Sequence, residues 1–297
     1  MKVKHIKLNG DRTIKDYIWE KPNNTEDQIV VKNIMSGICS SDVSMYTGKM
    51  DMLPEHMHGH EGLGQVVAVG KNVTGVKVDD IVATRGEPAF ADIYNVRDGE
   101  FVVVPEALPK YILEPVACAV NIADIVGKIK DKSVLIIGSG FLARVIYQVM
   151  LYNNKTKDLD VVVVGNAYNE WWSSQGIVAD DFVDSTYDVI IDLSDRAEEF
   201  NIDRLNNSGH YIMCAEKTTP NVDWAPFLWK NITVSCPSPR AKDFHGKMVK
   251  ANVLVQKDII QVDDMWVKGY SRDEAETAFA NRASGIDKGR TYLTWQQ

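Results

Sequence analysis

Residues 134–143 read VLIIGSGFLA, and this stretch decides the fold. The apolar run Val134–Gly138 predicts a strand buried on both faces, the glycines predict a tight turn, and Phe141–Leu151 predicts an apolar helix. Similar strand candidates follow at Val161–Gly165, Val189–Leu193, Tyr211–Ala215 and Ile232–Cys236. Continuous apolar strands that alternate with helical stretches are typical of a parallel sheet covered on both faces. We therefore expect a doubly wound α/β domain over residues 126–267.

The turn in this stretch carries a candidate dinucleotide site. Glycines after a strand let the backbone approach a pyrophosphate, and the N-terminus of the following helix offers unpaired N–H groups to it. The candidate cofactor-binding residues of this turn are Gly138, Gly140, Phe141 and Leu142. The alternative is a strand-to-helix turn that binds nothing.

The end of the next strand bears on the choice of cofactor. A dinucleotide fold expects an acidic residue there to hold the ribose hydroxyls, but this strand ends in Gly165 and Asn166. Without that carboxylate, a 2′-phosphate meets no negative charge. This pattern favours NADP, although no arginine or lysine follows closely, and NAD stays the alternative.

The first third of the chain is rich in short strand candidates. The runs Gln28–Val31, Gly64–Val69 and Asp80–Ala83 are separated by turn residues, which suits a compact barrel-like antiparallel unit. Near the C-terminus, Ser271 with a glutamate three residues later predicts a capping box, and Thr291–Trp295 predicts a strand. We expect the first third of the chain to form a β-rich unit.

Composition restricts the classes of function. The chain has 297 residues, 45% hydrophobic and 25% charged, which suits two globular domains. Its net charge of -8 disfavours binding to nucleic acid or to an anionic membrane surface. The start has no apolar core of signal-peptide length, and no apolar run approaches the ~20 residues that span a bilayer. We expect a cytoplasmic protein with no membrane or nucleic-acid partner.

The cysteines are dispersed, which fits thiols or metal ligands in a reducing compartment. Cys214 and Cys236 lie in apolar strand candidates and are expected to be core thiols, and His210 is expected in a surface turn. The remaining two are Cys39 and Cys118.

Four residues of the first domain have the chemistry of zinc ligands. Cys39, His60, Glu61 and Glu114 offer a thiolate, an imidazole and carboxylates, and three protein ligands leave a fourth position open, as in catalytic zinc sites. Residue types alone do not decide this. A packed thiol, a satisfied histidine and solvated carboxylates are the alternative.

The stretches GICSSDV, GHEGLGQVVAVGKNVTGVKVDDIVA, LEPVACAV and VLIIGSGFLARVIYQ occur in one order and spacing. In this they resemble the zinc-dependent medium-chain dehydrogenase/reductase family, the alcohol, polyol and threonine dehydrogenases, as do the weaker segments DVIIDLS, GHYIMC and DEAETAF…DKGRTYL. The resemblance implies an α/β fold in which a GroES-like catalytic domain, residues 1–125 plus 268–297, encloses a Rossmann dinucleotide-binding domain, residues 126–267.

The resemblance also implies residue roles. Cys39 and His60 match the first two ligands of one catalytic zinc, and Glu61 matches a carboxylate that binds the metal or lies beside it. Glu114 matches the third ligand or a group just behind it. Ser41 matches the hydroxyl that accepts the alcohol proton.

Two further features depart from the family pattern. The stretch ATRGEPAFADIYNV lacks the four cysteines that bind a structural zinc in many relatives, so we expect at most one zinc. Ser44 stands where many relatives have the histidine that completes the proton relay, so the relay is expected through Ser44, the cofactor ribose or His56.

The sequence thus predicts a zinc-dependent NAD(P)-linked oxidoreductase that interconverts a secondary alcohol or polyol and its ketone or aldehyde. Its partners would be a small-molecule substrate and further copies in a homodimer or homotetramer, as is common among relatives. The alternatives are a zinc-free quinone-oxidoreductase-like NADPH reductase and a non-catalytic nucleotide-binding protein that kept the fold.

Overall fold

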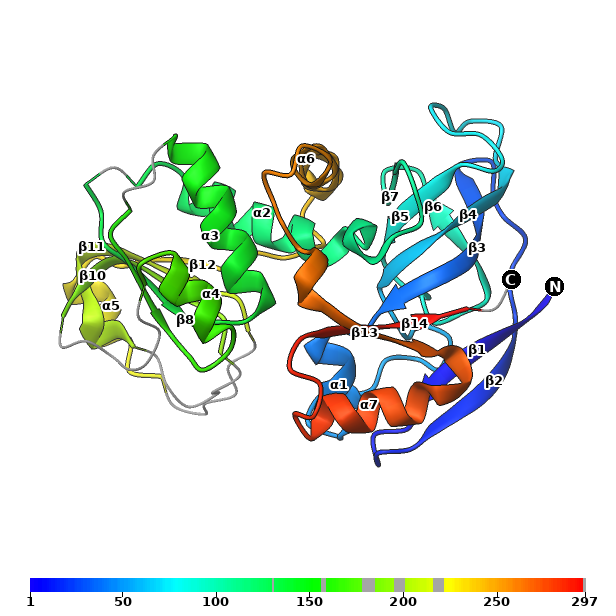
Figure 1. Cartoon of the computed structure of the whole chain (residues 1–297), viewed down its shortest axis with the longest axis horizontal. Helices are drawn as coiled ribbons and strands as arrows, with labels where there is room; N and C mark the ends of the chain where they lie inside the picture. The colour runs from blue at the N-terminus through cyan, green and yellow to red at the C-terminus, as the bar shows by residue number, and fades with distance from the viewer. Residues whose placement is uncertain (130, 156–158, 178–184, 195–200, 216–221, 296–297) are drawn as a thin grey trace. The chain divides into compact units, whose positions relative to one another are not determined.

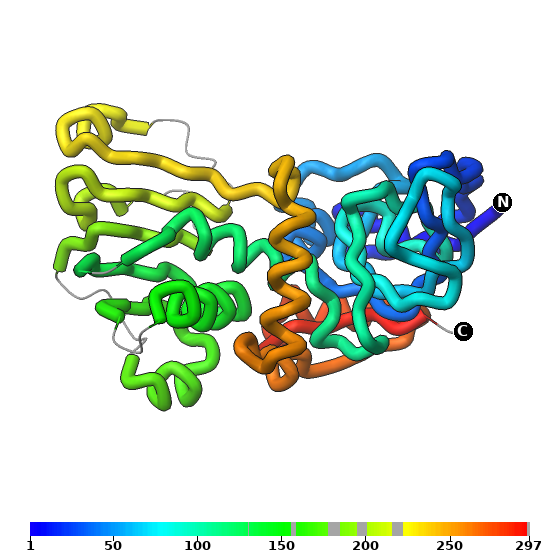
Figure 2. Tube along the Cα trace, turned by 90° about the horizontal axis from the view of Figure 1, so that it is seen from above, coloured from blue at the N-terminus to red at the C-terminus, as the bar shows by residue number. Residues whose placement is uncertain are grey.

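The computed structural model describes residues 1–129, 131–155, 159–177, 185–194, 201–215 and 222–295. The chain divides into two compact units (Figures 1 and 2). Unit 1 comprises Met1–Ala117 and His245–Gln297, and unit 2 comprises Cys118–Phe244. The first boundary falls inside helix α2 (Glu114–Val126) and the second at the start of α6 (Phe244–Gln256). The sequence places these boundaries later, at 125/126 and 267/268.

Unit 2 contains the parallel sheet that the apolar runs predict. Its strands lie in the order β12-β11-β10-β8-β9, and every neighbouring pair is parallel. The strands are β8 (Val134–Ile137), β9 (Val161–Val164), β10 (Tyr187–Asp192), β11 (Leu205–Met213) and β12 (Thr233–Ser235). All four residues of β8 and five of the six residues of β10 are buried. Because side chains alternate between the two faces of a sheet, both faces are covered here, which explains the continuous apolar sequence of these strands. The expected α/β class is confirmed.

Three helices accompany this sheet among the described residues: α3 (Phe141–Asn154), α4 (Asn169–Ser174) and α5 (Ala225–Trp229). Phe227 of α5 and Ile202 of the short helix η2 (Ile202–Arg204) pack in one core with Leu135 and Ile190 of the sheet. Figure 1 shows α3 crossing in front of the strands. It starts directly after the turn that follows β8.

Unit 1 is built around a seven-stranded mixed sheet. Its order is β13-β14-β3-β4-β5-β7, and β6 pairs with β3 off this path. The strands are β3 (Gln28–Gly37), β4 (Glu61–Val69), β5 (Ile81–Arg85), β6 (Ile93–Arg97), β7 (Phe101–Val103), β13 (Trp266–Ser271) and β14 (Arg290–Thr294). A separate antiparallel pair is β1 (Lys2–Leu8) and β2 (Ile14–Glu20). The helical elements of unit 1 include α1 (Ser40–Tyr46), η1 (Pro109–Tyr111), α6 from His245 onward, η3 (Asp263–Met265), η4 (Arg272–Glu274) and α7 (Ala275–Ala283). The connection from β5 to β6 is only residues 86–92 and contains no cysteine.

Some local expectations are confirmed and others are wrong. Ser271 caps η4, with its hydroxyl accepting from the Asp273 N–H and Glu274 accepting from the Ser271 N–H. His210 was expected in a surface turn, but it lies in β11, half-buried, within hydrogen-bond distance of Ser235. Cys236 was expected in the core, but it is exposed, because β12 is the edge strand of its sheet.

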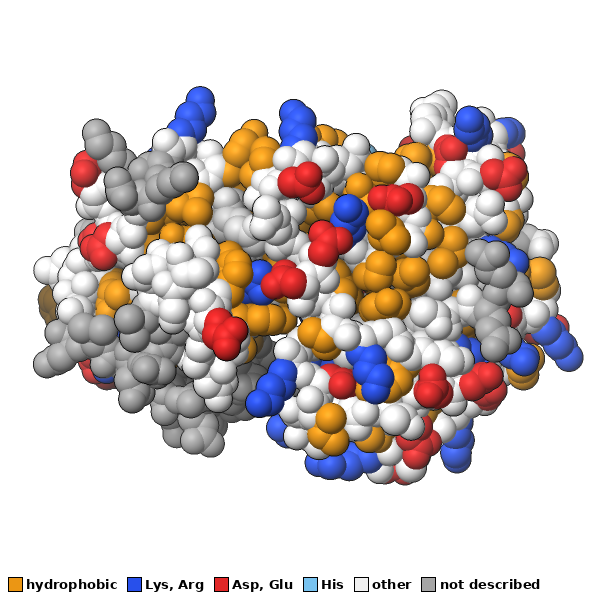
Figure 3. Space-filling model, viewed as in Figure 1, with side chains coloured by type: hydrophobic (Ala, Val, Ile, Leu, Met, Phe, Trp, Pro, Cys, Tyr) orange, Lys and Arg blue, Asp and Glu red, His pale blue; other side chains and the backbone are white. Residues whose placement is uncertain are grey.

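The surface mixes charged and apolar side chains. On the face drawn in Figure 3, hydrophobic side chains gather over the part of unit 1 where Figure 1 draws β5 and β7. The exposed apolar residues of this region include Val103 and Leu108. Across the described part of the chain, every helix is too short or too polar to cross a membrane.

Candidate functional site

The register of two antiparallel strands brings the first candidate ligands together. Ser36, near the end of β3, pairs with Gly62, near the start of β4. Cys39 follows the end of β3 and His60 precedes β4, so the two residues emerge at the same end of the strand pair. A sequence separation of about twenty residues therefore becomes a spatial contact.

The candidate metal-binding atoms of Cys39, His60 and Glu61 all lie within 4.8 Å of one another. Cys39 and His60 are half-buried, whereas Glu61 is fully buried. The Oε1 atom of Glu61 has no hydrogen-bond partner among the described residues. A buried carboxylate oxygen without a partner is costly unless a cation or donor meets it.

Glu114 is not a member of this set of three. It is the first residue of α2, is buried, and lies close enough for its charge to act on His60 and Arg290. The structure thus places it beside the three candidate ligands without showing direct access to a shared atom.

Asp42 lies between Cys39 and His60. Its Oδ2 accepts a hydrogen bond from the Cys39 N–H at 2.9 Å, and its Oδ1 lies 3.6 Å from Nδ1 of His60. Burial raises the pKa of Asp42 to about 6. Burial also disfavours charged His60, but nearby anionic groups, led by Asp42, outweigh it and raise the pKa of His60 well above its usual value.

Arg290 forms a buried ion pair with Glu61. The Nη2 atom of this first residue of β14 donates to Oε2 of Glu61, and the guanidinium lies 5.2 Å from the centre of the Trp266 ring. Burial disfavours the charged guanidinium, yet Glu61, Cys39 and Glu114 keep its pKa above the usual value. Gly37 makes room for this pair, because a Cβ there would overlap the Glu61 carboxylate.

The predicted relay residues lie on or near α1. Ser41 is in its first turn and Ser44 one turn further, and both are half-buried. His56 is exposed and stacks on Trp19, with 5.5 Å between the ring centres. Ser41 is thus two residues after Cys39, which is the N-cap residue of α1. The ring contact found for His56 is with Trp19 and not with a candidate ligand.

In unit 2, the turn after β8 has an open helix N-terminus. Gly138 adopts φ +107°, a conformation that a side-chain-bearing residue rarely takes. Gly140 is the N-cap of α3 and offers no side-chain cap, and a Cβ there would meet only open space. Phe141 is buried and Leu142 half-buried, so they pack the first turn of the helix, and the Gly138 N–H donates to the Val164 carbonyl at 2.7 Å.

The end of β9 packs directly on this turn. Gly165 adopts φ +155°, and a Cβ there would lie 2.5 Å from Oγ and 2.7 Å from N of Ser139. The Ser139 hydroxyl accepts from the Ala167 N–H at 2.8 Å, and its carbonyl accepts from Nε1 of Trp172 at 3.0 Å. Asn166 is exposed.

Comparison with known proteins shows what the chain is similar to. Residues 25–108 match the model of the alcohol dehydrogenase GroES-like domain. An L-threonine 3-dehydrogenase of Caldanaerobacter subterraneus subsp. tengcongensis is 30% identical over 173 residues, which cover 46% of this chain and 49% of that protein, about half its length. An L-threonine 3-dehydrogenase of Aliivibrio fischeri is 23% identical over the whole of both chains. The chain is thus similar to alcohol dehydrogenases over residues 25–108 and, more distantly, to an L-threonine 3-dehydrogenase over its whole length.

A solved structure shares the fold of this chain. A thermostable alcohol dehydrogenase from Pyrobaculum aerophilum superimposes with a TM-score of 0.81 over 99% of this chain and 100% of that chain, at 15% identity. At this identity, the likeness concerns the fold. The expected combination of a GroES-like domain with a Rossmann-like parallel sheet is thereby confirmed.

Sequence reasoning missed two residues of the site. Asp42 stands three residues after Cys39, the spacing of a capping residue, which is a signal that could have found it. Arg290 comes directly before the strand candidate Thr291–Trp295, which has no charged residue. Its partner Glu61 is 229 residues away in the chain, so only the strand register reveals the pair.

Proposed function

We propose that this medium-chain dehydrogenase-like protein is a zinc-dependent NAD(P)-linked oxidoreductase that interconverts a secondary alcohol or polyol and its ketone or aldehyde. One observation carries the proposal: a thiol, an imidazole and a carboxylate converge within 4.8 Å, and the carboxylate keeps a buried oxygen without a hydrogen-bond partner. This donor set fits zinc, which takes sulfur, nitrogen and oxygen ligands.

Cys39, His60 and either Glu61 or Glu114 would hold the metal. When bound, zinc supplies Lewis acidity that lowers the pKa of a coordinated alcohol. Asp42 fixes the Cys39 backbone and orients the His60 ring, as carboxylates behind metal-binding histidines commonly do. Arg290 holds one Glu61 oxygen, which leaves the other for the metal.

Ser41 is proposed as the group that accepts the alcohol proton, with Ser44 as the next member of the relay. A serine transfers a proton through its hydroxyl but does not retain it near neutral pH as an imidazole can. The Ser41 and Ser44 hydroxyls would therefore pass the proton onward without either serine becoming charged.

The turn Gly138–Gly140 is proposed as the pyrophosphate site of the nicotinamide cofactor. The observation that fits the group is the uncapped start of α3 with open space beyond Gly140. Gly165 and Asn166 would lie at the adenosine ribose. Their lack of a carboxylate supports NADP over NAD.

Zinc content and turnover test the proposal together. The purified chain, loaded with zinc and dialysed, is expected to hold about one zinc per chain by mass spectrometry of the metal. It is expected to reduce NADP or NAD with at least one member of a panel of secondary alcohols, polyols and L-threonine. The threonine arm follows from the relatives, which are L-threonine 3-dehydrogenases.

Two cysteine variants provide the contrast. Cys39→Ala is expected to lose the zinc and more than 100-fold in turnover, whereas Cys236→Ala, at an exposed position, is expected to keep both. Undiminished turnover in Cys39→Ala would overturn the zinc mechanism. NADPH-dependent reduction of quinones without zinc would favour the reductase alternative, and nucleotide binding without turnover the non-catalytic one.

A further inference from the structure

Gly165, the first residue after β9, has no room for the acidic side chain that NAD-binding folds commonly place at this strand end. A side chain at Gly165 would collide with the backbone N and the hydroxyl of Ser139, as the 2.5 and 2.7 Å approaches show. Hydrogen bonds from Ala167 and Trp172 to Ser139 fix the two segments against each other. The absence of a carboxylate at this strand end is therefore built into the packing of the loop.

A cation lies directly under the same loop. Arg144 of α3 is 2% exposed, and its guanidinium carbon lies 4.8 Å from the centre of the Tyr168 ring and 4.4 Å from that of Trp171. Both rings follow the end of β9 within seven residues. Figure 1 draws α3 and α4 near one another, and Tyr147 of α3 contacts the ring of Trp171, with 6.1 Å between ring centres.

The stacking keeps the positive charge in place. An arginine remains charged when buried, and aromatic faces stabilise its planar guanidinium. Among residues 165–172 the single acid is Glu170, whose side chain is exposed. The described part of the loop thus presents neutral groups above a buried cation.

We propose that Arg144 determines cofactor specificity by favouring a phosphate on the 2′-oxygen of the adenosine ribose, so that the ligand class is NADP. The proposal rests on the proposed dinucleotide site in unit 2 and not on the zinc. In strand–turn–helix sites, the end of the second strand faces the adenosine ribose. The positive charge of Arg144 attracts a 2′-phosphate dianion bound at the adenosine ribose. Movement of the Tyr168 ring gives the guanidinium direct access to this phosphate for paired hydrogen bonds.

This cation escapes a search of the sequence after the strand, because it precedes the strand by about twenty residues. An arginine that binds the 2′-phosphate is normally sought in the residues after the second strand of the dinucleotide-binding fold, which is β9 here. Here helix α3 delivers it from the other side, through contact with the aromatic residues of α4.

Binding of two nucleotide probes by isothermal titration calorimetry tests the proposal on the full chain. Wild type is expected to bind adenosine 2′,5′-bisphosphate at least tenfold more tightly than adenosine 5′-monophosphate. Arg144→Leu is expected to remove most of this difference and to leave affinity for the monophosphate within about twofold. Arg144→Lys, which keeps the charge, is expected to retain part of the preference.

A second pair of variants covers a failure of Arg144→Leu to fold, which circular dichroism would detect. Asn166→Asp adds a charge at an exposed position of the loop and is expected to weaken bisphosphate binding tenfold while sparing the monophosphate. Asn169→Asp, also exposed, is the matched control and is expected to have a smaller effect.

Equal affinity of wild type for both probes, absence of binding to either, or an equal loss of both in Arg144→Leu overturns the proposal. The zinc-dependent reaction can fail independently, because these measurements use neither metal nor turnover. A protein that discriminates between the probes but lacks zinc would support Arg144 and reject the proposed dehydrogenase.

Discussion

The pair formed by Glu61 and Arg290 illustrates what a single buried charge requires. Two ions that leave water lose several kcal/mol of hydration each, and a well-made pair only recovers this. Arg290 contacts one oxygen of Glu61 and lies over the Trp266 ring, while the second oxygen is unpaired among the described residues. A second cation bound at the free Glu61 oxygen would compensate for this unpaired buried group. At the scale of one residue, the site is therefore prepared for a ligand rather than optimised for stability.

His5 is a second buried ionisable group, remote in sequence from the candidate ligands. It lies in β1, fully buried, with 6.0 Å between its ring centre and that of His58. Burial, with a smaller contribution from His58, lowers the pKa of His5 to about 3. Such a histidine contributes stability above its unfolded pKa near 6.5, and that contribution falls as the pH drops towards 3.

We expect this histidine to make the protein acid-sensitive. Between pH 7.5 and 5.0, wild type should lose at most about 2 kcal/mol of unfolding free energy through His5. Urea unfolding at both pH values measures the loss. His5→Leu should show a smaller loss, whereas His245→Leu, at an exposed position, should match wild type. Equal acid sensitivity of His5→Leu and wild type would contradict the assignment.

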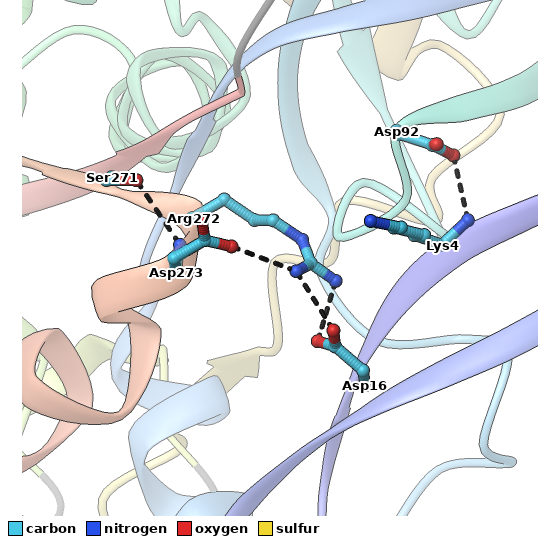
Figure 4. A network of polar contacts seen from close by, with 6 residues as sticks. All are labelled: Lys4, Asp16, Asp92, Ser271, Arg272 and Asp273. Carbon is cyan, nitrogen blue, oxygen red and sulfur yellow. Dashed lines mark hydrogen bonds and ion pairs between the residues drawn. The ribbon is translucent and has the colours of Figure 1, made fainter.

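At the scale of elements, one arginine ties the N-terminal strand pair to the C-terminal part of unit 1. Arg272 of η4 donates to both carboxylate oxygens of Asp16 in β2, at 3.1 and 2.7 Å, and to Asp273 at 3.2 Å. Figure 4 shows the guanidinium between these two carboxylates, with the Ser271 cap and the contact of Lys4 with Asp92 nearby. The Arg272 side chain is 13% exposed and that of Asp16 is 61% exposed, so the arginine is the shielded partner of this pair.

Removal of this contact should cost little but measurable stability. Asp16→Asn is expected to lower the unfolding free energy by about 0.5–1 kcal/mol, because paired hydrogen bonds to a shielded arginine exceed the usual surface value. Glu26→Gln breaks the pair with Lys71, in which both side chains are exposed, and should cost less than about 0.3 kcal/mol. Equal effects in urea unfolding would show that shielding of Arg272 adds nothing.

Elements were predictable where local sequence dictates them. The strand at Val134 and the helix at Phe141 follow from continuous burial and from the glycine turn, and the Ser271 cap follows from its spacing to Glu274. The role of Arg290 was not predictable, because β14 reaches β3 only through long-range register. Exposure of Cys236 also escaped prediction, since an edge strand and a central strand have similar residue types.

At the scale of the whole chain, the candidate metal site and the candidate dinucleotide site belong to different units. Cys39, His60 and Glu61 lie in unit 1, whereas Gly138, Gly140 and Arg144 lie in unit 2. Each unit has its own buried core, as the clusters that contain Ile6 and Val66 in unit 1 and Ile190 in unit 2 show. Ligands that bind only the folded form stabilise the segment that must open to release them.

Hydrogen exchange with each ligand alone should therefore separate the two units. Zinc should slow exchange of amides in residues 39–46 and 60–69, and a chelator such as dipicolinate should reverse this. Adenosine 2′,5′-bisphosphate should slow exchange in 138–147 and 165–174. At a hundredfold excess over the dissociation constant, each ligand contributes about 2.7 kcal/mol, enough to slow local opening roughly a hundredfold. If either ligand slowed both sets equally, the chain would open as one cooperative body, and the division into independently stabilised units would be wrong.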